Sequence, residues 1–343
     1  MKRYDELTRL GLLRRLRELA TAALDAYGLT GARLTFQQYS ANVVFRVDAP
    51  GHVPFRDEQS LYVPNRYALR VLAISDLDTI ASELTWLAAL RREADLPVPE
   101  PVPTLDGRLF ITVRTSGVPH GRVVSLLRWV DGRHLATCMQ PDHARALGRL
   151  VAQLHCFSAG WKLPEGFTRF HWDWDGQFGE RELGDTAGLI ASIPVGFQAP
   201  FHAVSQQVRE VMDSFGKGPD AYGLVHADLY LENVLFHAGQ PRLIDFEDCG
   251  FSYWMCDLGV FLSQWPWTDE FPRVRDAFLA GYGQVRTLPE VQLKHLDLFM
   301  AAQYAQLVLW ASAFIRNDPA RRTEHEAWRE REGIKLLRYF ERR

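Results

Sequence analysis

Polar side chains interrupt the apolar stretch LVHADLYLENVLF, which covers residues 224 to 236. They are His226, Asp228 and Asn233, and a further aspartate, Asp245, lies near the end of the next apolar run, RLIDF. A carboxylate and an amide oxygen suit a hard cation such as Mg²⁺, which usually takes one or two protein carboxylates together with water and substrate phosphates. A second carboxylate beside such a cation can act as a general base. These residue types therefore predict a metal site with a base next to it.

The spacing of these residues predicts how they meet. NVLF and RLIDF are separated by the turn residues HAGQP, which is typical of a β-hairpin. In an antiparallel hairpin the start of the first strand and the end of the second lie at the same open end, so we expect Asn233 and Asp245 to be neighbours and to hold the metal. Asp228 precedes Asn233 in the loop that enters the hairpin, and we expect it to face the same opening.

Composition narrows the classes of protein that the chain can belong to. It has 343 residues, of which 47% are hydrophobic and 24% charged, so it is long enough for two lobes and too apolar for a disordered or fibrous protein. Its formal net charge of -3 gives no electrostatic footprint for nucleic acid or an anionic membrane. We therefore predict small-molecule partners, with no nucleic acid and no membrane. The oligomeric state is not predicted.

Cysteine usage and apolar segments indicate the compartment. The four cysteines form neither the close pairs of a zinc site nor the dense pattern of a secreted scaffold. The N-terminus mixes charge into every turn and lacks the apolar stretch of a signal peptide. Residues 298 to 314 are apolar but are broken by two glutamines, which favours a buried helix over a membrane span. We expect a cytoplasmic protein.

The periodicity of the chain predicts an α+β fold. Residues 5–27 and 76–92 have helical spacing, and from Pro141 onward the chain is helix-rich apart from the hairpin. Stretches rich in β-branched and aromatic residues predict five earlier strands, at residues 32–40, 41–49, 66–73, 109–115 and 122–130. Residues 49–65 contain three prolines and a glycine and are typical of an irregular loop. We expect a small antiparallel-sheet lobe in residues 1–130 and a mostly helical lobe in residues 131–343.

The segments HADLYLEN and LIDFEDCGFSYWMCDLG resemble the catalytic loop and metal-binding segment of the protein-kinase-like fold. The resemblance is to its small-molecule branch of aminoglycoside, choline and homoserine kinases. It extends from about residue 30 to about residue 315, with its specific motifs between residues 224 and 259. It implies a two-lobe fold that uses ATP and Mg²⁺ to phosphorylate a hydroxyl group of a small-molecule acceptor.

The resemblance also assigns roles in the helical lobe. Asp228 is then the catalytic base, Asn233 and Asp245 hold Mg²⁺, and His226 and Asp257 brace the loop. Phosphoryl transfer depends on positioning and charge neutralisation rather than on covalent chemistry by the protein, which fits these residue types. The alternative is that the polar residues only cap turns and pin the hairpin.

In the N-terminal lobe, YALR at residues 67–70 resembles the strand that carries the phosphate-binding lysine of kinases. Ala68 would lie against the adenine, Arg70 stands in the place of the lysine, and Glu83 in the next helix is the matching ion-pair partner. Arginine offers a permanent charge and bidentate phosphate contacts but differs from lysine in length and shape. The alternative is a surface arginine on an edge strand.

Further nucleotide contacts follow from the same resemblance. Ser40 and Asn42 match an S-x-N loop whose backbone N–H groups and short polar side chains can touch phosphates, although an ordinary turn has the same composition. The adenine would lie against Leu235 and Ile244 as well as Ala68, with the backbone from Arg128 to Val130 bonding its edge. The apolar side chains in this set are equally explained as core residues.

Other clusters leave two interpretations open. Residues 172–175, WDWD, form either an aromatic and acidic wall for a cationic amine or a packed loop. Glu247 and Asp248 either help to hold a second metal or belong to a turn. His155 falls in the apolar stripe of LGRLVAQLHCF and is read as a core histidine with satisfied hydrogen bonds.

Three functional classes share this fold. A small-molecule kinase is favoured over a protein serine/threonine kinase, because Ala227 replaces the arginine that regulated protein kinases place before the catalytic aspartate, and only a short segment separates Asp245 from Asp257. A nucleotide-binding pseudokinase is the third class, but such proteins tend to lose the base or the metal ligands, all of which are present here. The acceptor stays open among amino alcohols, hydroxy amino acids, aminoglycosides and sugars.

Overall fold

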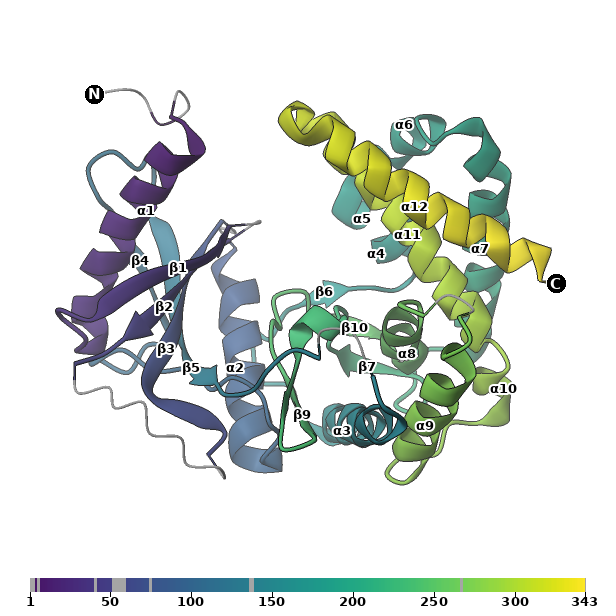
Figure 1. Cartoon of the computed structure of the whole chain (residues 1–343), viewed down its shortest axis with the longest axis horizontal. Coiled ribbons are helices and arrows are strands. Elements are labelled where there is room, and N and C mark those ends of the chain that lie inside the picture. The colour runs from purple at the N-terminus through teal and green to yellow at the C-terminus, as the bar shows by residue number, and fades with distance from the viewer. Residues whose placement is uncertain are drawn as a thin grey trace. The chain divides into compact units, whose positions relative to one another are not determined.

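The chain divides into two compact units. The structure, a computed structural model, describes Tyr4 and residues 7–39, 42–50, 60–73, 76–135, 139–265 and 268–342. The first unit contains Met1–Arg133, Pro164–Thr168 and Arg242–Ile244, and the second contains His134–Leu163, Arg169–Pro241 and Asp245–Arg343. The first is built on a sheet and the second mostly on helices, as the elements labelled in Figure 1 show. The predicted α+β class is confirmed.

The first unit is an antiparallel sheet with a helix on each face (Figure 1). Its strands are β1 (Arg33–Tyr39), β2 (Val43–Asp48), β3 (Tyr62–Leu72), β4 (Phe110–Val113) and β5 (Arg122–Val130), in the order β1-β2-β3-β5-β4. Its helices are α1 (Arg9–Ala23), followed by the turn η2 (Leu24–Tyr27), and α2 (Leu77–Ala94). The core under α1 contains alternate residues of β2 and β3, including Phe45, Leu69 and Val71. Because strand side chains alternate between faces, Arg70 points to the opposite face, where α2 lies.

The third strand begins earlier than the sequence predicts. We expected it at Arg66, but β3 starts at Tyr62, whose partner in β5 is Val130. The register is irregular between Tyr62 and Tyr67, where Pro64 has no N–H group and Asn65 has a left-handed φ of 53°. The proline therefore marks a bulge rather than the end of a loop.

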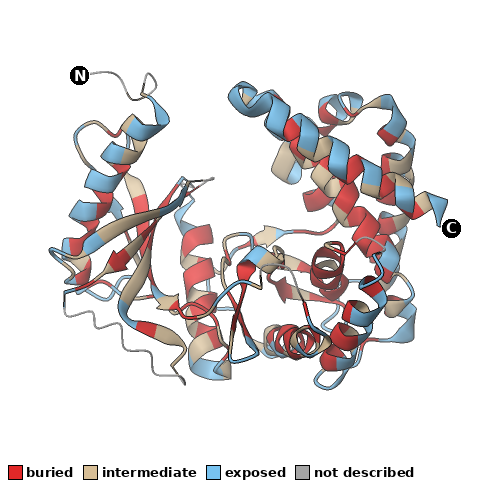
Figure 2. Cartoon of the chain, viewed as in Figure 1, coloured by how far each residue is buried: buried red, intermediate tan, exposed pale blue. Residues whose placement is uncertain are grey.

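The second unit is mostly helical. Its longer helices are α3 (Pro141–Gly160), α7 (Val195–Phe215), α8 (Trp254–Leu262), α9 (Phe271–Gly283), α11 (Leu296–Asn317) and α12 (Arg322–Glu341). The short ones are α4 (Trp174–Phe178), α5 (Glu180–Leu183), α6 (Thr186–Ala191), α10 (Glu290–Leu293), η3 (Leu231–Asn233) and η4 (Pro319–Arg321). Figure 2 shows α8 in red over nearly all of its length, whereas the buried residues of α3 lie between Ala144 and His155.

Two small sheets lie among these helices. The predicted hairpin is present as β8 (Val234–His237) and β9 (Gln240–Leu243). A second sheet, in the order β6-β10-β7, joins Phe170–His171, Gly250–Tyr253 and Tyr222–Val225. The prediction that the hairpin alone interrupts the helices is therefore wrong. The missed strands have two to four residues each, too few for an alternating pattern to be recognised.

Helices α3 and α9 meet backbone to backbone. A Cβ atom on Gly148 would lie 2.0 Å from the carbonyl oxygen of Phe278, and one on Gly281 would lie 1.9 Å from that of Arg145. No side chain fits at either position, so the two glycines permit the approach. The contact brings His155 of α3 beside Tyr282 of α9, where their side chains form a hydrogen bond of 2.8 Å.

The apolar segment at residues 298 to 314 belongs to α11. Within the described residues, α11 is the one helix that is long and apolar enough to cross a membrane, and 72% of its most apolar stretch is buried inside the protein. The predicted buried helix is confirmed.

Candidate active site

The loop that carries Asp228 leaves β7 through a strained backbone. His226 is fully buried, and Ala227 has a φ of 66°, a left-handed conformation that is unusual for a residue with a Cβ. Asp257, in the first turn of α8, accepts hydrogen bonds from the N–H of His226 at 3.0 Å and from that of Ala227 at 2.8 Å. A strained conformation persists only where its surroundings fix it, and here one carboxylate fixes both peptide groups.

The imidazole of His226 is fully buried and contacts the loop from inside the protein. Its Nδ1 accepts a hydrogen bond from the N–H of Asp228 at 3.3 Å, and the ring packs against Phe246 at 4.5 Å between centroids. An accepting Nδ1 places the ring proton on Nε2. His226 therefore has the contacts of a brace.

Asp257 is itself held by a second buried histidine. The Nε2 of His155 lies 3.0 Å from Oδ2 of Asp257, and its Nδ1 lies 2.8 Å from the hydroxyl of Tyr282. Burial lowers the pKa of His155 more than Asp257 raises it, so the ring is neutral and donates from Nε2. Burial would raise the pKa of Asp257, but the hydrogen bonds from His155 and the loop hold it below its usual range. His155 is satisfied in the core, as predicted; its link to the loop was missed.

Asp228 and Asn233 are in direct contact. Asn233 ends the turn η3, and its Nδ2 donates to the backbone carbonyl of Asp228 at 2.9 Å and to Oδ2 of the same residue at 2.6 Å. Burial and the nearby carboxylates of Asp248 and Asp245 raise the pKa of Asp228 to about 7. The site therefore concentrates negative charge, which a cation would relieve.

Asp245 follows β9 by two residues and has a left-handed φ of 63°. Asp tolerates this conformation better than most residues, because its short polar side chain can bond locally. The NH₂ group of Asn233 is committed to Asp228, which leaves the amide oxygen as the atom for a metal. One carboxylate and one amide oxygen beside an acidic cluster fit the few protein ligands that Mg²⁺ takes.

In the first unit, Arg70 and Glu83 form the predicted ion pair. Nη1 of Arg70 lies 2.7 Å from Oε1 of Glu83, and Nε donates to the hydroxyl of Ser125 at 3.2 Å. The exposed fractions of the two charged side chains are 7% and 3%. The alternative of a surface arginine on an edge strand is wrong, because β3 lies between β2 and β5. Ala68 lies two residues before Arg70, on the same face of β3, and is half-buried.

The S-x-N loop is described only in part. Ser40 lies outside the described residues. Asn42 is 3% exposed, and its Oδ1 accepts a hydrogen bond from the N–H of Ala73 at 2.6 Å. The amide oxygen therefore ties the start of β2 to the end of β3. Because the oxygen already has this partner, the predicted contact with phosphate can involve only the NH₂ group, and that contact stays a prediction.

The residues expected around the adenine differ in burial. Val130 and Leu235 are buried, and Ile244 is half-buried. The backbone from Arg128 to Val130 was expected to bond the edge of the base, but the N–H of Arg128 already donates to the carbonyl of Glu100 at 2.8 Å. That N–H group is therefore excluded from the predicted set. The contacts of the other residues with a nucleotide stay predictions.

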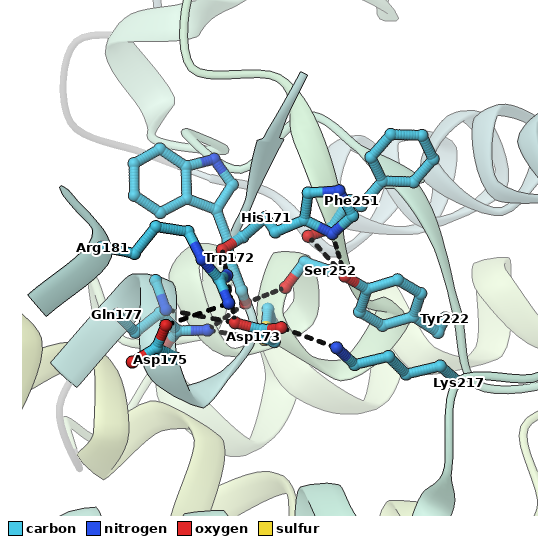
Figure 3. Close-up of polar contacts among 12 residues, drawn as sticks. His171, Trp172, Asp173, Asp175, Gln177, Arg181, Lys217, Tyr222, Phe251 and Ser252 are labelled. Atoms are coloured by element: carbon cyan, nitrogen blue, oxygen red, sulfur yellow. Dashed lines mark hydrogen bonds and ion pairs between the residues drawn. The ribbon is translucent and has the colours of Figure 1, made fainter. Parts of the chain in front are cut away.

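The WDWD loop is packed, and its acidic groups are neutralised. Figure 3 shows Asp173 between Arg181 and Lys217, whose nitrogens lie 2.7 Å and 2.6 Å from its two oxygens. Asp173 also accepts from the N–H of Gly176 and so caps α4. Asp175 pairs with Arg181 at 3.0 Å. The alternative of an acidic wall for a cationic amine is wrong for these carboxylates, because their charge is already paired.

The fold and these residues define a protein-kinase-like phosphotransferase. The sequence model of the phosphotransferase enzyme family matches residues 52–293, and the chain belongs to this family. The enzyme is a small-molecule kinase with a hydroxyl acceptor. Amicoumacin kinase of Bacillus subtilis (strain 168) is 25% identical over 305 residues, which span 84% of this chain and 82% of that protein. Homoserine kinase of Neisseria meningitidis serogroup B is 26% identical over 262 residues, or 73% and 76% of the two chains.

Solved structures agree with this assignment. A microcompartment-associated aminopropanol kinase superposes with a TM-score of 0.78 at 29% identity, covering 95% of this chain and 98% of that one. An amicoumacin kinase in complex with AMP-PNP, Ca²⁺ and Ami has a TM-score of 0.71 at 19% identity, covering 94% of this chain and 92% of that one. The second likeness shows the fold alone.

Asp257→Asn should lower the free energy of unfolding by about 1–3 kcal/mol, because the amide oxygen can accept from only one loop N–H while the NH₂ group faces the other. Urea denaturation near neutral pH measures the loss. Asp213→Asn, on the exposed side of α7, is the matched control, and its change should stay within about 0.5 kcal/mol. Equal effects of the two substitutions would contradict the bracing role.

The size of this loss should depend on pH. Because the pKa of Asp257 is depressed in the folded protein, the carboxylate contributes stability above about pH 4 and loses it as the pH falls through the folded-state pKa. The difference between wild type and Asp257→Asn should therefore narrow below about pH 4.

Proposed function

We propose that this enzyme transfers the γ-phosphate of ATP to a hydroxyl group of a small amine-bearing alcohol, with Asp228 as general base. The observation that carries the proposal is the contact between Asp228 and Asn233, 2.6 Å from oxygen to nitrogen. Burial, and after it the neighbouring carboxylates, raise the pKa of Asp228 to about 7. A base with a pKa near the working pH accepts a proton efficiently and is still partly ionised.

The phosphoryl group passes directly from ATP to the acceptor, with no covalent intermediate on the protein. The acceptor hydroxyl gives its proton to the carboxylate of Asp228 while its oxygen forms a bond to the γ-phosphorus. The bond from that phosphorus to the bridging oxygen breaks, and ADP leaves with the electron pair. Asn233 orients Asp228 through the two hydrogen bonds from its NH₂ group.

Asn233 and Asp245 are the residues that would hold Mg²⁺, and a bound Mg²⁺ supplies charge neutralisation for the phosphates. A cation at Asp245 would also lower the pKa of Asp228, because it offsets a carboxylate that raises it. Arg70 would contact phosphate oxygens with its guanidinium while Glu83 and Ser125 fix its orientation. Ala68, Val130, Leu235 and Ile244 would contact the adenine.

The acceptor class rests on the relatives. The aminopropanol kinase and the homoserine kinase are named for small alcohols that carry an amino group. A protein serine/threonine kinase fits less well, because residues 250–262, shortly after Asp245, are committed to β10 and α8. A pseudokinase fits less well because Asp228, Asn233 and Asp245 are all present. We also propose a cytoplasmic location, supported by the free thiols of Cys156 and Cys256.

The experiment that tests the function is a coupled ADP-release screen of the purified chain with Mg²⁺ and ATP. The acceptors are amino alcohols, hydroxy amino acids, aminoglycosides and sugars, with casein as the protein control. Turnover should be greatest on a small amino alcohol or hydroxy amino acid. Turnover on casein alone would overturn the proposal, and turnover only on neutral sugars would overturn the acceptor class.

Substitutions of Asp228, Asn233 and Asp245 should affect turnover and nucleotide binding in different ways. Asp228→Asn removes the proton acceptor and keeps the shape, so turnover should fall by about 10²- to 10⁴-fold while Mg²⁺-nucleotide binding survives. Asp245→Asn and Asn233→Ala should weaken Mg²⁺-dependent nucleotide binding together with turnover. Calorimetric titration of Mg·AMP-PNP into each variant separates the two patterns. Loss of binding in Asp228→Asn with intact binding in Asp245→Asn would reverse the assigned roles.

Arg70 should matter for ATP use beyond its part in the fold. Arg70→Met should lower kcat/KM for ATP by about tenfold or more, because charge-assisted hydrogen bonds are lost, and Arg70→Lys should keep part of the activity. Arg66→Met is the control, since it breaks another ion pair of β3, with Asp48 at 2.6 Å. If Arg66→Met and Arg70→Met have equal effects on ATP kinetics, Arg70 has only a structural role.

A further inference from the structure

A short strand and the residues that flank it are hydrogen-bonded to the segment that follows Asp245. Strand β6 consists of Phe170 and His171 and pairs in parallel with Gly250 and Phe251 of β10. The residues that flank β6, Arg169 and Trp172, both carry side-chain N–H groups, and both are buried, with exposed fractions of 5% and 9%. Their hydrogen bonds go to the chain just before β10.

Three consecutive peptide carbonyls receive these bonds. Nε of Arg169 donates to the carbonyl oxygen of Cys249 at 2.6 Å, and Nη2 donates to that of Glu247. Nε1 of Trp172 donates to the carbonyl between them, that of Asp248, at 2.7 Å. A guanidinium can serve two acceptors at once because its donors form a rigid fork. We call Arg169 and Trp172 the carbonyl clamp.

The clamp is itself fixed in place. The backbone of Trp172 donates to the carbonyl of Phe251 at 2.8 Å and accepts from the side chains of Gln177 at 2.6 Å and Ser252 at 2.7 Å. Figure 3 shows the bonds from Gln177 and Ser252 converging on Trp172. A Cβ atom on Gly250 would lie 2.6 Å from the carbonyl oxygen of Phe170, so the glycine permits the two strands to approach.

The segment that the carbonyl clamp contacts is irregular. Residues 244–249, between β9 and β10, have no helix or strand of their own. The N–H of Cys249 donates to the carbonyl of Phe246 at 3.1 Å, as in a turn. Asp245 stands in the left-handed region with a φ of 63°, which an aspartate tolerates better than most residues but which still has a cost that surrounding contacts must offset.

We propose that Arg169 and Trp172 are positioning residues for Asp245. Their hydrogen bonds to the peptide carbonyls of residues 247 to 249 keep the Asp245 carboxylate oriented for Mg²⁺. They act through the backbone of the segment and contact neither substrate nor cation. The inference rests on the proposed function, in which Asp245 holds Mg²⁺.

A pair of tryptophan substitutions tests the clamp. Trp172→Phe keeps an aromatic ring and removes one indole N–H···O=C bond to Asp248, at 2.7 Å. Trp174→Phe is the matched control, because it removes one such bond from the same loop, to the carbonyl of Ser205 at 2.9 Å. Arg169→Lys is the second clamp variant, since lysine keeps the charge and loses the fork.

Two readouts are needed. Hydrogen exchange of peptides that cover residues 245–253 should become about three- to tenfold faster in Trp172→Phe and Arg169→Lys, as the loss of one hydrogen bond allows. In calorimetric titrations, the Mg²⁺-dependent affinity for AMP-PNP should fall by a similar factor of about three to ten in both variants. Trp174→Phe should change neither quantity.

The outcomes distinguish failure of the carbonyl clamp from failure of the proposed function. Faster exchange and weaker Mg²⁺-dependent binding in the clamp variants alone support the proposal. Equal exchange in Trp172→Phe and Trp174→Phe, or faster exchange with unchanged Mg²⁺ dependence, overturns it. If the wild type shows no Mg²⁺-dependent nucleotide binding, the proposed function fails, and with it the orientation of Asp245 for a cation.

Discussion

One buried carboxylate holds the loop that carries Asp228 in place. Asp257 is fully buried and meets two peptide N–H groups and the ring of His155, so that its charge is matched by hydrogen bonds rather than by water. The left-handed backbone at Ala227 depends on this carboxylate, and the position of Asp228 depends on Ala227. The chain of contacts continues through His155 to Tyr282, and therefore to the glycine-mediated contact between α3 and α9. The orientation of the loop is thus set by the packing of the helical unit.

Charged side chains at three places in the molecule differ in how their charge is compensated. The buried pair of Arg70 and Glu83 is compensated within the first unit. Asp173 is compensated by Arg181 and Lys217 and serves as a helix cap. Asp228 instead has its pKa raised by burial and by the carboxylates near it. Uncompensated charge costs stability, and proteins keep it where ligands and chemistry require it. This contrast distinguishes the proposed site from acidic groups that only support the fold.

Local spacing predicted the parts of the site that are close in sequence or match a family motif. The hairpin follows from its strand and turn pattern, and the pair of Arg70 and Glu83 follows from the resemblance to kinases. The β6-β10-β7 sheet was missed, because its strands are very short and Phe170 and Gly250 lie 80 residues apart. The pairing of Asp173 with Lys217 was missed for the same reason, since a distant partner leaves no trace in a local pattern. Asn42 was recognised as polar and placed in a loop, but its bond to Ala73 depends on where β3 ends.

The arginine at position 70 also changes which chemical reagents can detect the enzyme. Arg70 is proposed to stand where protein kinases carry a lysine, and a lysine beside bound phosphates is a nucleophile once it loses its proton. A guanidinium stays protonated at any pH at which the protein is folded, and so it does not attack acylating or sulfonylating groups. Nucleotide analogues that label the phosphate-binding lysine would therefore find no reactive group on Arg70. Surveys of kinases in a cell extract that depend on such labels would not register this enzyme through that position.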